Sequence, residues 1–438
     1  MRKTMVAAAA LAVFAGSGVP SAGLAEAPAA AKPAPSSYVI HAGFLLRDAE
    51  ATPSGPVTIT VSDGRIVSVQ DGTLPGPDGA RVIDLGDRMV LPGLVDLHVH
   101  LTDDPSGDWW REAVDTDEHV AVTTLKNAKV TLEAGFTTVR DLGGSIRAIA
   151  ATREGIAKGW FEGPRILAAG TPLSVIGGHG DVHGFRPEVM KVLEGDNVCT
   201  GAVQCAAVVR RTVRDGADVI KFMATGGVLS QGDKSLGQAF TDEEMKAIVD
   251  TAHELGVKVA AHAHADGGIL AATQAGVDSI EHGTFTSPAT AKVMKAKGTV
   301  LAPTLLAFKG IGEQLGTGFY TPAVETKIRM TLDHLGEGCR TARAAGVTIA
   351  FGTDSGVTAH GRNAEEFAML KDDCGMTARE ALASATTVAA KVLDMEGQIG
   401  RVAPGYSADL IAVEGNPLED LHRLEHVSWV MAQGRVAD

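Results

Sequence analysis

The stretch Met89–Thr102, M-V-L-P-G-L-V-D-L-H-V-H-L-T, decides how the rest of the chain is interpreted. An apolar run with a Pro-Gly turn signal leads to His98 and His100. Because side chains alternate along a strand, these two imidazoles point to the same face. Two imidazoles on a rigid strand can hold a metal ion. Two ligands alone do not make a site, so a pair of partly exposed histidines is an equal alternative for this stretch taken in isolation.

The length and charge of the chain limit its class. With 438 residues it is longer than one ordinary domain and suits a large barrel with a smaller module. The formal net charge of −14 argues against nucleic acids and anionic membranes as partners. We see no apolar run in the sequence that is long enough to span a membrane.

The first residues form a separate unit. A basic start is followed by an apolar run over Met5–Ala15 and then by small residues. This order is typical of a secretory signal peptide, which we place at residues 1–27, with a flexible leader of Ala and Pro at residues 28–37. The protein is therefore expected to be exported to the periplasm or the medium. A disordered tail that is never cleaved is the alternative.

Export permits disulfide bonds, and the chain has four cysteines. Cys199 and Cys205 flank a short segment and are able to pair. Buried free thiols are an equal alternative for all four, which include Cys339 and Cys374. None of them has the C-x-x-C spacing of a zinc site.

Both ends of the mature chain have a β pattern. Short apolar runs at 57–61 and 65–69 are separated by the turn Asp63-Gly64, and similar runs occur at 408–413 and 427–431. Neither end has enough apolar residues for a large core. We therefore predict one small β-sandwich built from both termini, residues 38–91 and 400–438.

Between these ends, residues 92–399 alternate strand and helix patterns, which is typical of parallel βαβ units in an α/β fold. Thr241 and Glu244 predict a capping box at the start of a helix over 242–255, and a second amphipathic stretch covers 323–345. Eight units make a (β/α)8 TIM barrel, whose active site lies at the carboxyl ends of the strands. The expected strands lie near residues 94–100, 137–141, 165–169, 219–223, 258–262, 279–282, 300–303 and 348–354.

Residues able to bind metal gather at those strand ends. Besides the first histidine pair, they are Lys221 within the fourth strand, His262 and His282 at the ends of the fifth and sixth, and Asp354 at the end of the eighth. Each has an ordinary alternative: a buried core histidine, an ion-pair partner or a helix cap. Their joint placement at the catalytic end of a barrel favours a metal site.

These residues give the chain a resemblance to the amidohydrolase superfamily over nearly its whole mature length. More narrowly, it resembles the branch of imidazolonepropionase-like proteins and metal-dependent Xaa-Pro dipeptidases, which includes enzymes that hydrolyse ochratoxin A. Beyond the pattern P-G-x-x-D-x-H-x-H from Pro92, the motifs that carry the resemblance are Gly177-Gly178-His179-Gly180, Lys221 followed by Thr225-Gly226-Gly227-Val228, Gly352-Thr353-Asp354-Ser355, His360-Gly361-x-Asn363 and Gly405-Tyr406-x-Ala408-Asp409-Leu410.

The resemblance implies a pair of divalent metal ions, with zinc expected because imidazole and carboxylate ligands suit it. One ion would be held by His98, His100 and Asp354, and the other by His262 and His282. A protonated lysine cannot bind a metal, so Lys221 would be carboxylated by carbon dioxide to a bridging carbamate. A hydroxide that bridges the metals would attack the substrate. Deaminases of the superfamily commonly lack this lysine.

Two residues receive catalytic roles from the resemblance. Asp354 would take the proton of the attacking water and deliver it to the leaving amine, and His179 would help to polarise the scissile carbonyl. The predicted substrate-binding residues are His179, Gly227, Val228 and His360. Candidates for binding a substrate carboxylate are His183, Arg186, Lys234, His360 and Arg362.

We therefore expect an exported binuclear hydrolase that cleaves an amide bond of a small molecule: a dipeptide, an N-acyl amino acid or ochratoxin A. A cyclic-amide hydrolase or deaminase of the same superfamily is the nearest alternative. A non-catalytic periplasmic binding protein that has kept the barrel is the other. The resemblance also implies a symmetric homo-oligomer, up to an octamer.

Overall fold

The computed structural model describes residues 37–106, 108–231 and 235–437. The predicted signal peptide, residues 1–27, lies outside the described residues, as does the predicted leader, residues 28–37, apart from Ser37. Within the described part of the chain, no helix is long and apolar enough to cross a membrane.

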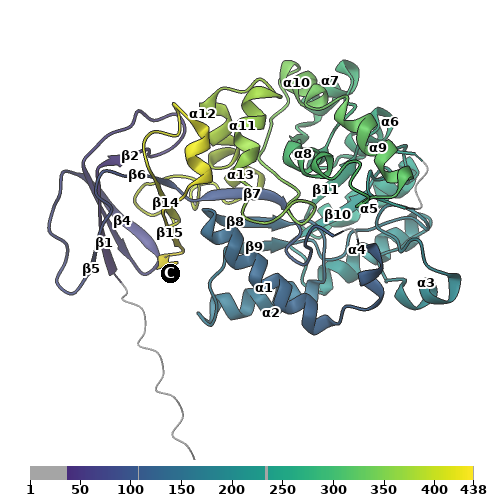
Figure 1. Ribbon diagram of the computed structural model, residues 1–438, viewed down its shortest axis with the longest axis horizontal. Coiled ribbons are helices and arrows are strands. Elements are labelled where there is room, and N and C mark those ends of the chain that lie inside the picture. Colours follow the sequence, from purple (N-terminus) through teal and green to yellow (C-terminus); the bar gives the residue numbers. More distant parts are fainter. Residues whose placement is uncertain (1–36, 107, 232–234, 438) are drawn as a thin grey trace, which may run out of the picture. The chain divides into compact units, whose positions relative to one another are not determined.

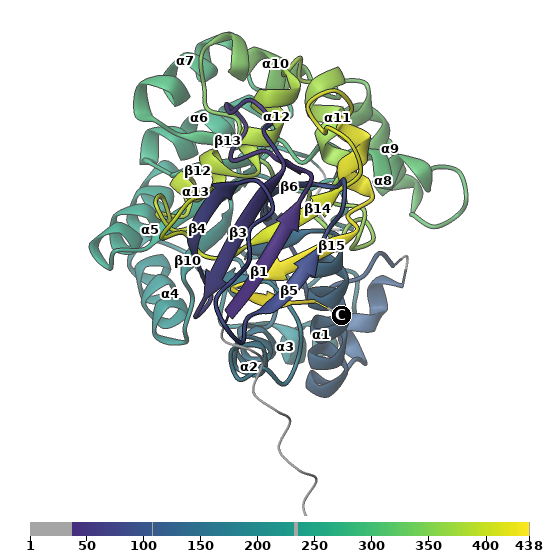
Figure 2. The ribbon, with the colours of Figure 1, turned by 90° about the vertical axis from the view of Figure 1, so that its left-hand side faces the viewer.

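Strands from both ends of the chain form two sheets that face each other. One has the order β4-β3-β1-β5, which Figure 2 shows face on, and the other has the order β16-β15-β14-β6-β2. β14 pairs antiparallel with β6, so the two ends of the chain are joined within one sheet. The bounds are β1(Ser37–Ala42), β2(Phe44–Leu45), β3(Val57–Ser62), β4(Arg65–Asp71), β5(Arg81–Asp84), β6(Met89–Pro92), β14(Leu410–Val413), β15(Trp429–Ala432) and β16(Arg435–Val436).

Tight turns and a shared apolar core explain these sheets. Asp63 and Gly64 between β3 and β4 both have positive φ, as do Gln433 and Gly434 between β15 and β16. Positive φ at both central residues is the signature of the hairpin turn that matches strand twist. The apolar side chains between the sheets are fully buried and come from both, for example Ile40, Ile59, Val90, Leu410 and Met431.

The middle of the chain contains parallel strands that fall into two sheets, β7-β8-β9 and β10-β11-β12-β13. Isolated parallel bridges join neighbouring segments beyond these sheets, namely Leu173 with Phe222, Leu301 with Ile349 and Val99 with Ser355. The expected eighth strand near 348–354 forms only such isolated bridges and no continuous strand pairing. The bounds are β7(Leu94–Val99), β8(Phe136–Asp141), β9(Arg165–Ala168), β10(Val219–Met223), β11(Lys258–Ala263), β12(Ser279–His282) and β13(Val300–Ala302).

Helices alternate with these strands, and Figure 1 shows α1 and α2 beside β8 and β9. The predicted capping box is present at the start of α5. The amphipathic stretch 323–345 is not one helix, because the chain turns at Gly336 with φ 74° between α9 and α10. The helices are α1(Asp117–Glu133), α2(Ile146–Ala157), α3(Pro187–Leu193), α4(Ala202–Arg214), α5(Asp242–Glu254), α6(Asp266–Ala275), α7(Pro288–Lys297), α8(Leu305–Glu313), α9(Pro322–Leu332), α10(Glu337–Ala344), α11(Glu365–Asp372), α12(Ala378–Ser384) and α13(Thr387–Val392), with short 3-10 helices η1(Trp109–Ala113) and η2(Leu421–Glu425).

The four cysteines form two disulfides, Cys199–Cys205 and Cys339–Cys374. The first joins the segment before α4 to the first turn of α4 over a separation of six residues, and the second joins α10 to the chain after α11 over a separation of 35 residues. The first pair is the one that the sequence named as able to form. Free thiols, the alternative, are not found among these four residues.

Candidate active site

A cavity of about 110 Å³ opens where the carboxyl ends of β7, β10, β11 and β12 meet. This is the end of a parallel sheet at which α/β enzymes bind their ligands. The cavity contains every predicted metal ligand, together with His179 and one wall of apolar side chains. Its lining residues are His98, His100, His179, Lys221, Met223, Val228, Leu229, His262, His264, His282, Ala307, Phe308, Ile311, Asp354 and Val357.

One cluster of ligand atoms consists of His98, His100 and Asp354. Oδ1 of Asp354 lies 3.2 Å from Nε2 of His98 and 3.0 Å from Nε2 of His100. Asp354 has φ 61°, an uncommon conformation for a residue other than glycine, and its N–H donates to the carbonyl of His98. Such backbone conformations cluster at functional sites. The predicted first ligand set is therefore assembled in one place.

Three of these histidines have Nδ1 in hydrogen-bond contact with a neighbouring protein group. Nδ1 of His98 donates to Glu281 at 3.0 Å, and Nδ1 of His100 donates to the carbonyl of Gly143 at 2.9 Å. Nδ1 of His282 lies 2.6 Å from Oγ1 of Thr304. These contacts orient each ring and leave Nε2 for the cavity. Metal-binding histidines have this arrangement, with the second ring nitrogen held by a protein group.

The second cluster contains His262 and His282, as predicted, but also His264. His264 is buried, and its Nδ1 lies 2.9 Å from Oγ1 of Thr284. Its ring stacks on that of His282 at an interplanar angle of 17°. His264 is not in the predicted ligand set. The signal was present, because His262 and His264 repeat the spacing of His98 and His100.

Lys221 projects from the middle of β10 into the same cavity, and it is 1% exposed. Its Nζ lies 3.4 Å from Nε2 of His98. Burial disfavours the ammonium form and lowers the pKa of Lys221 to about 8, although Glu281 and Asp354 oppose this shift. The neutral amine is therefore far more populated near neutral pH than in an exposed lysine.

Charge in the first cluster is strongly coupled. Burial would raise the pKa of Asp354, yet the imidazoles of His98 and His100 hold it well below its usual range. Burial would lower the pKa of His100, yet its hydrogen bond to Asp354 raises it to about 9. In the second cluster, burial and neighbouring imidazoles hold the pKa values of His262 and His282 well below the ordinary value. Neutral imidazole is the form that binds metals.

The residues present fit a pair of divalent ions. Each of the two clusters offers three ligand atoms within 4.8 Å of one another, from imidazole nitrogens in one case and from imidazoles and a carboxylate in the other. These are ligand types that zinc accepts, and three protein ligands are usual for catalytic zinc. Lys221 lies in the same cavity as both clusters.

His179 enters the cavity from the loop between β9 and α3. Burial lowers the pKa of His179 to about 3, and the nearby His264 and Lys221 act in the same direction. Its Nδ1 lies 2.5 Å from Oγ of Ser230. The position of His179 agrees with a role in contacting a substrate.

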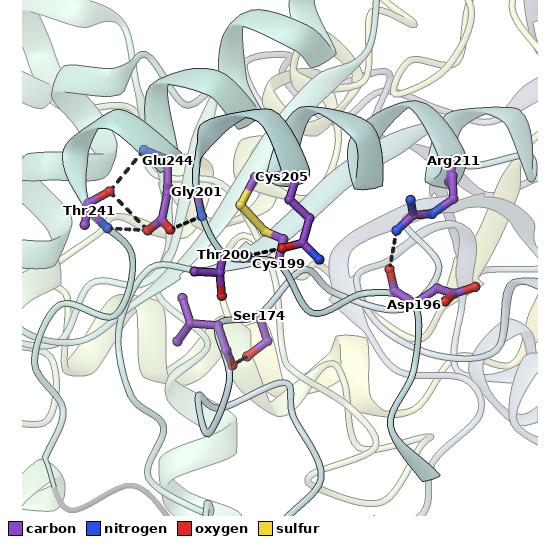
Figure 3. The surroundings of a disulfide bond; sticks show 11 residues. Ser174, Asp196, Cys199, Thr200, Gly201, Cys205, Arg211, Thr241 and Glu244 are labelled. Carbon is purple, nitrogen blue, oxygen red and sulfur yellow. Dashed lines mark hydrogen bonds between the residues drawn. A yellow bond between two sulfur atoms is a disulfide. The ribbon is translucent and has the colours of Figure 1, made fainter. Parts of the chain in front are cut away.

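The loop that presents His179 is attached to the segment before α4. The side chain of Asn197 donates to the carbonyls of Pro172 and Gly180, and the N–H of Cys199 donates to the carbonyl of Ser174. Cys199 is bonded in turn to Cys205 in the first turn of α4, as Figure 3 shows. The disulfide therefore ties residues 197–199, which hold the His179 loop by hydrogen bonds, to α4.

The other predicted substrate-binding residues have different surroundings. Val228 lines the cavity. Gly227 lies behind His179, since a Cβ on it would come within 2.2 Å of the imidazole ring. Both ring nitrogens of His360 are engaged, with Thr131 and with the carbonyl of His100, so it lies behind a metal ligand and does not line the cavity.

The candidates for binding a carboxylate also lie away from the described lining of the cavity. Arg362 is paired with Glu313 and Glu365. His183 contacts the carbonyl of Gly178, and Arg186 is exposed. Lys234, the remaining candidate, is outside the described residues.

Part of the apolar wall of the cavity comes from α8, which contributes Ala307, Phe308 and Ile311. The start of α8 is held by the buried Glu366 of α11, whose two carboxyl oxygens accept hydrogen bonds from the N–H groups of residues 305 and 306. A carboxyl group at a helix N-terminus satisfies N–H groups that have no partner in the helix. This contact fixes the wall relative to the rest of the site.

Comparisons with known proteins agree with this geometry. A model of the amidohydrolase family matches residues 89–437. Ochratoxinase of Aspergillus niger is 30% identical over 403 residues, which are 87% of this chain and 82% of that protein. Imidazolonepropionase of Paracoccus denitrificans is 28% identical over 405 residues, covering 84% of this chain and 91% of that protein.

Solved structures give the same result. A Xaa-Pro dipeptidase with methionine bound in its active site is 37% identical, with a TM-score of 0.86 over 92% of this chain and 100% of that chain. The crystal structure of A. niger ochratoxinase is 28% identical, with a TM-score of 0.79 over 91% of this chain and 95% of that chain. The chain therefore belongs to the amidohydrolase family and is a metal-dependent hydrolase that acts on C–N bonds.

Proposed function

We propose that this protein is an exported binuclear amidohydrolase that cleaves the amide bond of dipeptides or N-acyl amino acids, with ochratoxin A as a further substrate. One observation carries the proposal: two clusters of metal-ligand atoms and a buried lysine share one cavity with an apolar wall. The similarity to ochratoxinase and to a Xaa-Pro dipeptidase supports the choice of substrate.

His98, His100 and Asp354 would hold one ion, and His262 and His282 the other, with zinc expected. The neutral amine of Lys221 adds to carbon dioxide, forming an N–C bond and losing a proton, and the resulting carbamate supplies a further anionic ligand. When bound, the pair of ions lowers the pKa of water and polarises the substrate carbonyl. We assign His264 a supporting role, in which its ring packs against that of His282.

The chain's own residues perform the remaining chemistry. The carboxylate of Asp354 accepts the proton of the attacking water and delivers it to the leaving nitrogen. His179 donates a hydrogen bond to the carbonyl oxygen as negative charge develops there. The apolar wall, which includes Phe308 and Ile311, excludes water and binds an apolar side chain of the substrate.

The screen that tests this proposal uses the zinc-loaded protein. It covers dipeptides, N-acyl amino acids with apolar or charged side chains, and ochratoxin A, with products identified by mass spectrometry. We expect a free amino acid and a carboxylic acid, and faster cleavage when the side chain is apolar. Absence of cleavage across these linear amides would refute the proposal.

A cyclic-amide hydrolase is the second candidate, and the similarity to imidazolonepropionase favours it. Cyclic imides and imidazolones in the same screen distinguish the two. If a ring-opened product forms faster than any product of a linear amide, the protein is a cyclic-amide hydrolase. Release of ammonia would identify a deaminase.

Several properties of the whole protein belong to the proposal as well. We propose a signal peptide at residues 1–27, a leader at 28–37, a β-sandwich from 38–91 and 400–438, and a closed (β/α)8 barrel at 92–399, which the bridges at Ile349 and Ser355 support. We also propose a homo-oligomer, up to an octamer. N-terminal sequencing of the exported protein and light scattering test the signal peptide and the oligomer.

A further inference from the structure

The segment after β10 forms a surface on which the ring of His179 rests. Gly227 provides the closest contact, because any Cβ there would lie 2.2 to 2.4 Å from three ring atoms. Ser230, which is buried, lies at the end of the same segment with Oγ 2.5 Å from Nδ1 of His179. The ring is therefore held by packing on one face and by one hydrogen bond at its edge.

Lys327 of α9 holds this segment in place. Its side chain is buried, and Nζ donates to the carbonyls of Gly227 at 2.7 Å and Ser230 at 2.8 Å. Burying an ammonium group is costly unless it is hydrogen-bonded, so a contact of this kind specifies one backbone conformation. The position of the Ser230 hydroxyl is consequently set by a contact outside the cavity.

The hydrogen-bond partners of Ser230 distinguish two forms of the His179 ring. A neutral imidazole has one N–H, which is at either Nδ1 or Nε2. If it is at Nδ1, the Ser230 hydroxyl accepts and its own proton needs another acceptor, yet the described part of the chain contains only the His179 contact for Oγ. If it is at Nε2, the hydroxyl donates to Nδ1, and the Nε2–H is left for an acceptor in the cavity that His179 lines.

We propose that Ser230 is a positioning residue that donates to Nδ1 of His179 and thereby fixes the tautomer whose Nε2–H faces the substrate. This inference rests on the proposed function for the identity of the substrate group, a carbonyl oxygen. In the opposite tautomer, the lone pair on Nε2 would repel that oxygen. Ser230 therefore determines whether His179 is a hydrogen-bond donor in the cavity.

Kinetics provide the first test, in the zinc-loaded full-length protein. Ser230→Ala should lower kcat about tenfold, the effect of losing one hydrogen bond that acts in the transition state, with KM within about twofold of the wild-type value. Ser230→Thr keeps the hydroxyl and should restore most of kcat. Ser235→Ala is the matched control, because this serine of the same loop is exposed and its hydroxyl accepts a hydrogen bond from the N–H of Gly237 rather than contacting His179.

A double-mutant cycle shows whether Ser230 acts through His179. In a His179→Gln background, the Ser230→Ala change should alter kcat less than about twofold, since the coupled partner is absent. A full tenfold loss in that background would overturn the proposal. Metal content and Tm are measured for every variant, so a loss of metal is distinguished from a loss of positioning.

The second test does not depend on activity. Solid-state NMR of the zinc-loaded protein with 15N-labelled histidine reports which ring nitrogen is protonated, and the signal that disappears in His179→Gln identifies His179. We expect protonated Nε2 and unprotonated Nδ1, with mixed tautomers in Ser230→Ala. A proton on Nδ1, in the neutral or the charged ring, would overturn the inference. If no amide is cleaved, the proposed function fails while these spectra still decide the tautomer.

Discussion

Lys221 lies in surroundings that are unfavourable for a charged ammonium group. It is 1% exposed, in a cavity that is also lined by four buried histidines and Asp354 and that has two clusters of possible metal ligands. A free ammonium group there would repel divalent cations, whereas a carbamate at the same nitrogen would bind them. The proposed binuclear site therefore depends on this one residue, which lies in the same cavity as both clusters.

Lys221→Ala should reduce metal content below the expected value of about two ions per chain and abolish activity, because the bridging ligand is lost. Short carboxylic acids that occupy the vacated space should restore part of the activity. Elemental analysis and the amidase assay measure these effects. The control is Lys246→Ala, an exposed lysine of α5 paired with Asp250. One tightly bound ion per chain in fully active wild-type protein would contradict the binuclear site.

Asp354→Asn keeps the size of the side chain but removes the base. We expect kcat to fall by about 10² to 10⁴, the range typical of a general acid–base residue. Circular dichroism and Tm should show an intact fold. Asp372→Asn, at an exposed position on α11, is the control. Near-normal turnover of Asp354→Asn would mean that another group transfers the proton.

At the scale of elements, the site depends on loops that are fixed by hydrogen bonds and a disulfide outside the cavity. The loop with His179 is attached to the segment 197–199, which the Cys199–Cys205 disulfide ties to α4 (Figure 3). The second disulfide, Cys339–Cys374, ties α10 to the chain after α11 and not to the segment that supports the His179 loop. The two bonds therefore have separable effects.

Replacing Cys199 and Cys205 together by Ser should lower kcat while costing only about 2 kcal/mol of stability, because the bond closes a short loop. The same change at Cys339 and Cys374 should cost about 4 kcal/mol, since the loop is longer, and leave kcat near the wild-type value. Denaturant unfolding and steady-state kinetics measure both variants. Equal effects of the two pairs on kcat would contradict a specific role of the first disulfide.

At the scale of the whole molecule, the metal ligands connect distant parts of the chain. His98 lies in β7, Lys221 in β10, His262 in β11 and His282 at the end of β12, while Asp354 follows β13 by some 50 residues of helix and loop. Any ion held by these residues binds the folded chain and not the unfolded one. Metal binding and global stability are therefore linked.

Removing metal with a chelator should lower Tm and abolish activity, and added zinc should restore both. The stability gained is about 2.7 kcal/mol when free metal is a hundred times its dissociation constant. Differential scanning calorimetry measures the shift in wild type and in Lys221→Ala, where we expect a smaller shift. An unchanged Tm after complete removal of metal would show that the clusters do not hold it.

Much of the fold was predictable because its signals are local. The turn Asp63-Gly64, the capping box of Thr241 and Glu244, and the ranges of β10 and β12 each depend on a few neighbouring residues. The amphipathic stretch 323–345 is divided between two helices, α9 and α10, because the backbone turns at Gly336, a break that the apolar spacing alone does not indicate. The strand expected near 348–354 forms only isolated bridges in the structure, because its pairing depends on partners far along the chain.

The sequence by itself determined the family, the hydrolytic class and the residues brought together in the cavity, since strand ends of parallel units meet at one edge whatever the loops do. Only the tertiary structure decided which neighbours hold those residues: Ser230 and Gly227 for His179, Thr304 for His282, and Glu366 for the wall on α8. It also removed His360 and Arg362 from the lining. The physical reason is that a side chain's hydrogen-bond partner is chosen by three-dimensional proximity, which spacing along one strand does not encode.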